Sequence, residues 1–152
     1  MANTQAMATS FKGELLNSYH NFSATNPART INTADSFKAA LYLASATINA
    51  STTAYTASGE VSGTNYTAGG VSITAWNAPT TSGTTGFTTP SSSITYTNVT
   101  LSTAFDAVLI YNNSQGNRSV SVHTFGSQTV TAGTFTLTMP TNDATNALIR
   151  LA

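Results

Sequence analysis

A single apolar stripe runs along residues 10–22, at the four-, four- and three-residue spacing of one helix face: Phe11, Leu15, Tyr19 and Phe22. Ser10 stands before the stripe and is a suitable N-cap, because its hydroxyl accepts a hydrogen bond from a free amide of the first turn. Pro27 disfavours helical geometry in the residue before it. The pattern predicts one helix over residues 10–22, preceded by an N-terminal arm of residues 1–9.

After the helix, the apolar positions recur with the period of two that is typical of strands. Seven segments show this pattern or a short apolar run: residues 36–44, 71–76, 94–99, 105–111, 119–125, 134–139 and 147–151. Segment 36–44 alternates like a half-buried strand. Segment 105–111 is the most apolar and predicts a central strand covered on both faces. The expected core positions are Phe11, Leu15, Phe37, Leu41, Leu43, Ile73, Val108, Ile110, Phe135, Leu137 and Ile149.

Turn signals separate these segments, at Gly69–Gly70, Asn112–Asn113, Gly116–Asn117, Ala132–Gly133 and Pro140. Residues 77–93 are rich in Thr, Ser, Gly and Pro and are too long for a tight hairpin, so we expect an exposed loop there. About seven short strands at this spacing predict an all-β fold, a β-sandwich or jelly-roll-like barrel with one N-terminal helix. Residues 10–152 are expected to form a single β domain.

The composition adds an expectation about association. The 152 residues suffice for one hydrophobic core, and 40% of them are apolar. Only 7% are charged, five basic against five acidic, while about thirty residues are Thr. A net charge of zero provides little long-range repulsion between copies. We therefore expect a protein that packs against neighbours, including copies of itself as a homo-oligomer.

The chain offers few residues for catalysis or for binding a cofactor. The five carboxylates are scattered along the sequence: Glu14, Asp35, Glu60, Asp106 and Asp143. His20, late in the predicted helix, and His123, on the polar side of a strand, lack the partner spacing of a metal site, and there is no Cys. No phosphate-binding loop or nucleophile elbow occurs. We expect no enzyme activity, no cofactor and no metal.

Nucleic acid and membrane are not expected as partners either. The five basic residues are dispersed, so the sequence shows no stripe that could follow a phosphate backbone. No stretch reaches the roughly eighteen apolar residues that a spanning helix needs. The first twenty residues lack the basic start and the apolar centre of a secretory signal, which favours synthesis in the cytoplasm. One binding function stays open on the residues alone: a surface carbohydrate site lined by Tyr55, Tyr66, Trp76 and Tyr96.

Four segments resemble parts of small virion proteins of tailed bacteriophages: FKGELLNSYHNF, DSFKAALYLASATINASTTAYTASGEVSGTNYTAGG, AVLIYNNSQGNRSVSVHTFGS and NALIRLA. The most distinctive parts are EVSGTNYTAGG and the LIYN segment. The resemblance covers most of the chain except residues 77–93. It implies a structural role in the virion and no catalytic residues.

Within the virion, the resemblance favours a capsid decoration (cement) protein that binds the outside of the head and stabilises it. The alternative is a neck or tail adaptor, or a tail-fibre-associated protein. The implied partners are the major capsid protein or other virion proteins, and the implied oligomer is a trimer, because decoration proteins often occupy three-fold positions. The implied final location is the virion, after synthesis in the bacterial host cytoplasm. No partner-binding residue is identified by the sequence.

Overall fold

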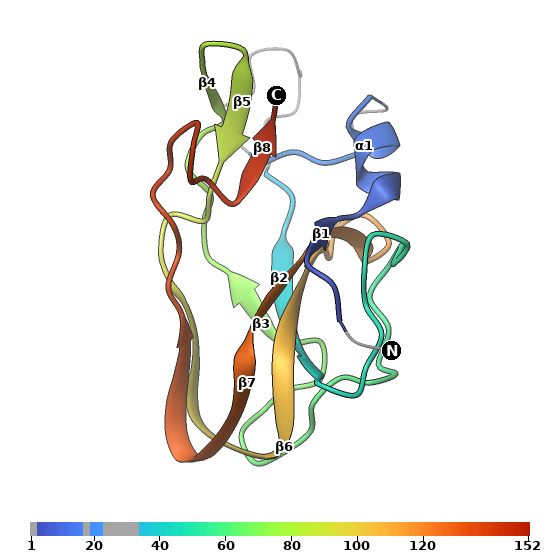
Figure 1. Cartoon of the computed structure of the whole chain (residues 1–152), viewed down its shortest axis with the longest axis vertical. Coiled ribbons are helices and arrows are strands. Elements are labelled where there is room, and N and C mark those ends of the chain that lie inside the picture. Colours follow the sequence, from blue (N-terminus) through green and yellow to red (C-terminus); the bar gives the residue numbers. More distant parts are fainter. Residues whose placement is uncertain (1–2, 17–18, 23–33) are drawn as a thin grey trace.

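A computed structural model describes residues 3–16, 19–22 and 34–152 of the chain. The elements in chain order are β1 (Ala6–Met7), α1 (Thr9–Leu16), β2 (Phe37–Leu43), β3 (Val71–Ile73), β4 (Thr80–Ser82), β5 (Thr85–Thr88), β6 (Ile94–Asn112), β7 (Arg118–Leu137) and β8 (Ile149–Leu151). They form two antiparallel sheets with one short helix near the N-terminus (Figure 1). The predicted all-β, sandwich-like fold is confirmed.

The larger sheet has five strands in the order β1-β7-β6-β2-β3, and the smaller has three in the order β4-β5-β8. The long strands β6 and β7 form an antiparallel ribbon that bends at the bottom of Figure 1. Several register shifts interrupt the ribbon and permit this bend. Because the ribbon curls over, rings from its two halves meet: the Phe135 ring lies 5.0 Å from that of Phe105 and 5.4 Å from that of Phe125.

Two hydrophobic clusters cover the two faces of the sheet where β2 pairs with β6. Val108 and Ile110 lie in the larger cluster, while Leu109 and Tyr111 lie in the smaller one. The prediction that both faces of this strand are covered is confirmed. Of the expected core positions, Phe11, Phe37, Leu41, Ile73, Val108, Ile110 and Ile149 are buried, and Leu15, Leu43, Phe135 and Leu137 are partly buried against the core.

The prediction that strand 36–44 is only half-buried is wrong. Ala40 and Tyr42, on the side expected to face water, are fully buried. The cause is the segment that follows β2, because Ala46 and Ile48 pack over this second face. Loop residues thus form the second layer here, and their apolar side chains are too few to have shown a periodic pattern.

The predicted helix 10–22 is too long. Helix α1 ends at Leu16, and residues 19–22 are not helical. Phe22 instead stacks on Phe37, with 4.6 Å between ring centroids, and touches Trp76 edge-on at 4.8 Å. This tertiary packing outweighs the local helical spacing. The stop signal at Pro27 lies outside the described residues.

The predicted exposed loop 77–93 contains the hairpin β4–β5. Gly83, with φ of 59°, lies in its turn, and β5 pairs with β8 near the C-terminus. Threonine is β-branched and suits a strand as well as a loop, so the composition of this segment did not distinguish the two.

The predicted turn at Ala132–Gly133 lies inside β7. Ala132 has φ of 44°, and the pairing with β6 shifts register there, which are the features of a bulge. The two segments expected on each side of this point therefore join into one strand, and so do segments 94–99 and 105–111 in β6.

The expected N-terminal arm, residues 1–9, packs on its own chain where it is described. Strand β1 pairs with β7, and the Thr4 amide donates to the Ile48 carbonyl at 3.1 Å. Ala8 is fully buried. The described part of the arm is thus a component of the domain.

Candidate functional site

Glu60 is the centre of a polar network in the described part of the chain. Its carboxylate accepts hydrogen bonds from the Tyr55 hydroxyl at 2.7 Å, the Tyr66 hydroxyl at 2.8 Å and the Gly69 amide at 2.7 Å. The Tyr66 hydroxyl in turn accepts from the Leu41 amide of β2 at 3.0 Å. The network therefore fastens the irregular segment 54–70 to the sheet.

The phenols around Glu60 are held in their neutral form. Burial, and then the hydrogen bond to Glu60, raise the pKa of Tyr55 to about 12. Burial, and then the nearby Glu60 charge, raise the pKa of Tyr111 to about 12. The pKa of Tyr66 is raised in the same direction by burial and by its bond to Glu60. A carboxylate surrounded by neutral donors suits structural cross-linking and provides no activated nucleophile.

A second polar cluster joins His20, Asn112 and Asp35. The Asn112 amide nitrogen lies 3.1 Å from His20 Nδ1 and donates to the Asp35 carboxylate at 2.8 Å. His20 is buried and lies beyond the end of α1, so the expected position late in the helix is wrong. Its ring packs edge-on against Phe11 at 4.7 Å. The cluster lies at the end of the larger sheet, because Asn112 is the last residue of β6.

The remaining described acids and His123 lie apart from these clusters. Asp106 accepts from the Asn3 side chain at 2.5 Å, and Asp143 accepts the amides of Thr145 and Asn146 in an exposed turn. His123 Nε2 lies 2.8 Å from the Ser121 hydroxyl, and burial lowers the pKa of His123 to about 4. Among the described residues, no group of His, Asp or Glu is arranged to hold a metal ion.

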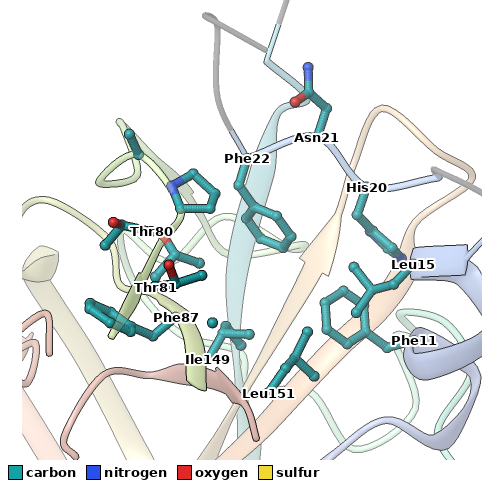
Figure 2. A pocket seen from close by; sticks show the side chains of 14 residues that line it. Phe11, Leu15, His20, Asn21, Phe22, Thr80, Thr81, Phe87, Ile149 and Leu151 are labelled. Carbon is teal, nitrogen blue, oxygen red and sulfur yellow. The ribbon is translucent and has the colours of Figure 1, made fainter. Parts of the chain in front are cut away.

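An apolar pocket of about 470 Å³ opens between α1, the β4–β5 hairpin and β8 (Figure 2). Its apolar walls come from Phe11, Leu15, Phe22, Phe87, Ile149 and Leu151, and Thr80 and Thr81 add hydroxyls from β4. His20 is the one titratable side chain among the described lining residues. The volume and lining suit an apolar side chain or a small apolar molecule, and the pocket provides no acid–base pair.

The bent β6–β7 ribbon carries a surface without charged residues over part of its length. Residues 61–105 and 119–142 contain no Asp, Glu, Lys or Arg. Residues 94–105 of the first stretch pair with residues 128–137 of the second in the ribbon, as in Thr95 opposite Thr136. Thr134, Thr136 and Thr138 are exposed, while Phe135 and Leu137 between them are half-buried. The sequence predicted this alternation, and the pairing brings two uncharged stretches onto one surface.

The aromatic residues considered for a carbohydrate site do not form an exposed platform. Tyr96 is buried and donates to the Ala39 carbonyl at 2.8 Å, and Tyr66 is bound to Glu60. Trp76 packs on Phe37 at 5.3 Å, and Tyr55 stacks on Tyr111 at 4.9 Å. The large hydrophobic side chains that are exposed in the described part are instead Tyr19 and Leu151.

Sequence reasoning missed the Glu60 network. Its one visible signal is an isolated acid at the start of EVSGTNYTAGG, followed by a Tyr and three glycines. No helix in the described part of the chain is long and apolar enough to cross a membrane. Comparison of the chain with models of protein families, with curated proteins and with solved structures gave no match.

Proposed function

We propose that the protein is a structural component of a tailed-bacteriophage virion, a decoration protein that binds the outer surface of the head and stabilises it. The observation that carries the proposal is the uncharged, hydroxyl-rich part of the β6–β7 ribbon, where residues 94–105 pair with residues 128–137. Such a surface contacts a neighbour without burying unpaired ions. A charged surface would lose binding free energy here, because each buried, unpaired charge loses its hydration. The hydroxyls of the ribbon donate and accept hydrogen bonds in many orientations.

Two further observations support a binding role. The described carboxylates accept hydrogen bonds within the fold, at Glu60, Asp35, Asp106 and Asp143. The segments that resemble phage virion proteins include EVSGTNYTAGG, which contains Glu60 and Tyr66. A particle-bound protein needs a rigid, complementary surface, and the network around Glu60 stiffens one side of this sheet.

The alternative within the virion is a neck or tail component, which would use a similar surface in far fewer copies. A carbohydrate-binding module has less support, because the candidate aromatics lie in the fold or in its polar network. The major capsid protein is the partner proposed for the decoration role.

A binding assay with heads that lack the protein tests the proposal. Purified chain is mixed with such heads, and we expect it to co-sediment with them and to raise the temperature at which they disrupt. The variant S102D/T103D places two charges on exposed positions of β6, where its pairing with β7 shifts register between Leu101 and Phe105. We expect this variant to bind heads about tenfold more weakly or worse.

The matched control is A57D/S58D, which adds the same charge at exposed positions outside the ribbon. It should bind like the native chain. Absence of binding by the native chain would argue against the decoration role, and equal binding by S102D/T103D would argue against the ribbon as the docking surface.

A further inference from the structure

The outer edge of β7 carries backbone groups that no described strand pairs. Strand β7 pairs with β6 along its length, and its other edge pairs with β1 only at Ser121 and Val122. Among the described residues, no backbone hydrogen bond from another element reaches residues 124–137 on this outer edge. Beyond the bulge at Ala132, residues 135–137 pair regularly with β6, and the register shift before them places the extra residue on β6, between Tyr96 and Val99. Their free edge is a template for one more strand.

This edge lacks the side chains that usually protect an exposed strand. Monomeric proteins place Lys, other charges or Pro on such edges. Strand β7 has no charged residue after Arg118 and no Pro. Its protection is limited to the bulge, which leaves residues 133–137 open. The half-buried state of Phe135 and Leu137 shows that the inner face is also incompletely covered at this edge.

We propose that the β7 edge over Gly133–Leu137 pairs antiparallel with the same edge of a second copy of this chain. A strand that pairs with its own copy places identical side chains on both sides of a two-fold axis. Charged residues would then repel across the axis, and this segment has none. A foreign partner would be selected by complementary charge or shape at the edge, and no charge is present there for such selection.

The sequence sets a favourable register for this pairing. With the axis at Phe135, each Thr134 lies opposite Thr136 of the second copy, and the two Phe135 rings lie opposite each other. Thr–Thr and aromatic pairs are among the favourable cross-strand pairs. The threonines would share the outer face and the rings the inner face, as they do within one ribbon. The inference goes beyond the proposed function and does not depend on it.

Sedimentation velocity at high micromolar concentration tests the pairing. We expect the native chain to form a dimer, and T134K/T136K, which sets lysines opposite each other across the axis, to be monomeric. The matched control is T95K/T97K, with the same added charge on exposed positions of the neighbouring strand β6. This control should dimerise like the native chain, and circular dichroism should show that all three are folded.

Cross-linking gives a second readout of the register. The chain has no Cys, so an introduced thiol is unique. A mixture of T134C and T136C should form a disulfide-linked heterodimer on oxidation, and each variant alone should form much less. A strictly monomeric native chain would overturn the proposal, as would a dimer that T134K/T136K leaves intact. A trimer would also overturn it, because two-fold pairing closes at two copies.

Discussion

At the scale of single residues, the polar side chains in the described part of this protein mainly hold separate segments of the chain together by hydrogen bonds. Glu60 holds two phenols and one amide in a segment without regular structure. Asn112 links the buried His20 to Asp35 at the end of the sheet. In the sequence these acids are scattered. Asp35 and Asn112 are distant along the chain, and only the folded topology brings them together. The partners of Glu60 lie within nine residues of it, but in a segment without regular structure, so no helix or strand spacing could have indicated them.

Replacing Glu60 by Gln should destabilise the fold by about 1–3 kcal/mol, because the NH₂ group that replaces one oxygen cannot accept the hydrogen bond of Tyr55 at Oε2, or those of Tyr66 and Gly69 at Oε1. Urea denaturation measures the free energy of unfolding. The control D143N removes a carboxylate from an exposed turn and should have a much smaller effect. Equal losses for the two variants would show that the Glu60 network contributes little.

The free energy of unfolding should fall as the pH decreases from about 6.5 to about 4. The pKa of His123 is lowered by burial to about 4 from an ordinary value of 6.5, so the unfolded chain takes up the proton first. This part of the stability is present above pH 6.5 and is lost toward pH 4. We expect H123Q to show a smaller fall in denaturation measurements across this range.

The control for the pH experiment is D143N. Hydrogen bonds from Asn146 and Thr145 lower the pKa of Asp143 below 3.8, so its contribution to stability is lost only at more acidic pH. D143N should therefore keep the native slope between pH 6.5 and 4. An unchanged slope in H123Q would assign the acid sensitivity to other groups.

At the scale of elements, the positions of β2, β3, β6, β7 and β8 could be predicted, whereas the lengths of β6 and β7 and the short strands β1, β4 and β5 could not. The alternation of Thr with Phe135 and Leu137 gave the buried side of β7 correctly. The same reasoning divided β6 and β7 at irregular points, because a bulge such as that at Ala132 looks like a turn in sequence. Helix α1 was predicted too long, since the pairing of Phe22 with Phe37 depends on tertiary contact.

The close approach of Gly70 to β2 gives a test of how tightly β3 is held. A Cβ at Gly70 would lie 1.8 Å from the Ala39 carbonyl oxygen, and φ is +72°. Gly83 also has positive φ, at +59°, but a Cβ there meets no atom within 4 Å. We expect G83A to cost about 1–2 kcal/mol from backbone strain alone, and G70A to cost clearly more because β2 or β3 must shift. Chemical denaturation compares the two, and equal costs would contradict this packing.

At the scale of the whole molecule, the distribution of charge is more informative than the total. Net charge and composition predicted association, and the structure adds where the uncharged surface lies. The uncharged residues 94–105 and 128–137 pair in the bent ribbon, which supports docking to a particle. The free edge of the same ribbon supports pairing of two copies, whereas the expected trimer rested on the resemblance alone.

The central claim, that this chain decorates a phage head, is tested most directly by its copy number in purified particles of the encoding phage. Quantitative mass spectrometry would measure the chain against the major capsid protein of the same particles. The decoration role predicts hundreds of copies per particle, in a fixed ratio to the capsid protein. A few copies or tens of copies would instead indicate a neck or tail component, and absence from the particle would contradict the account.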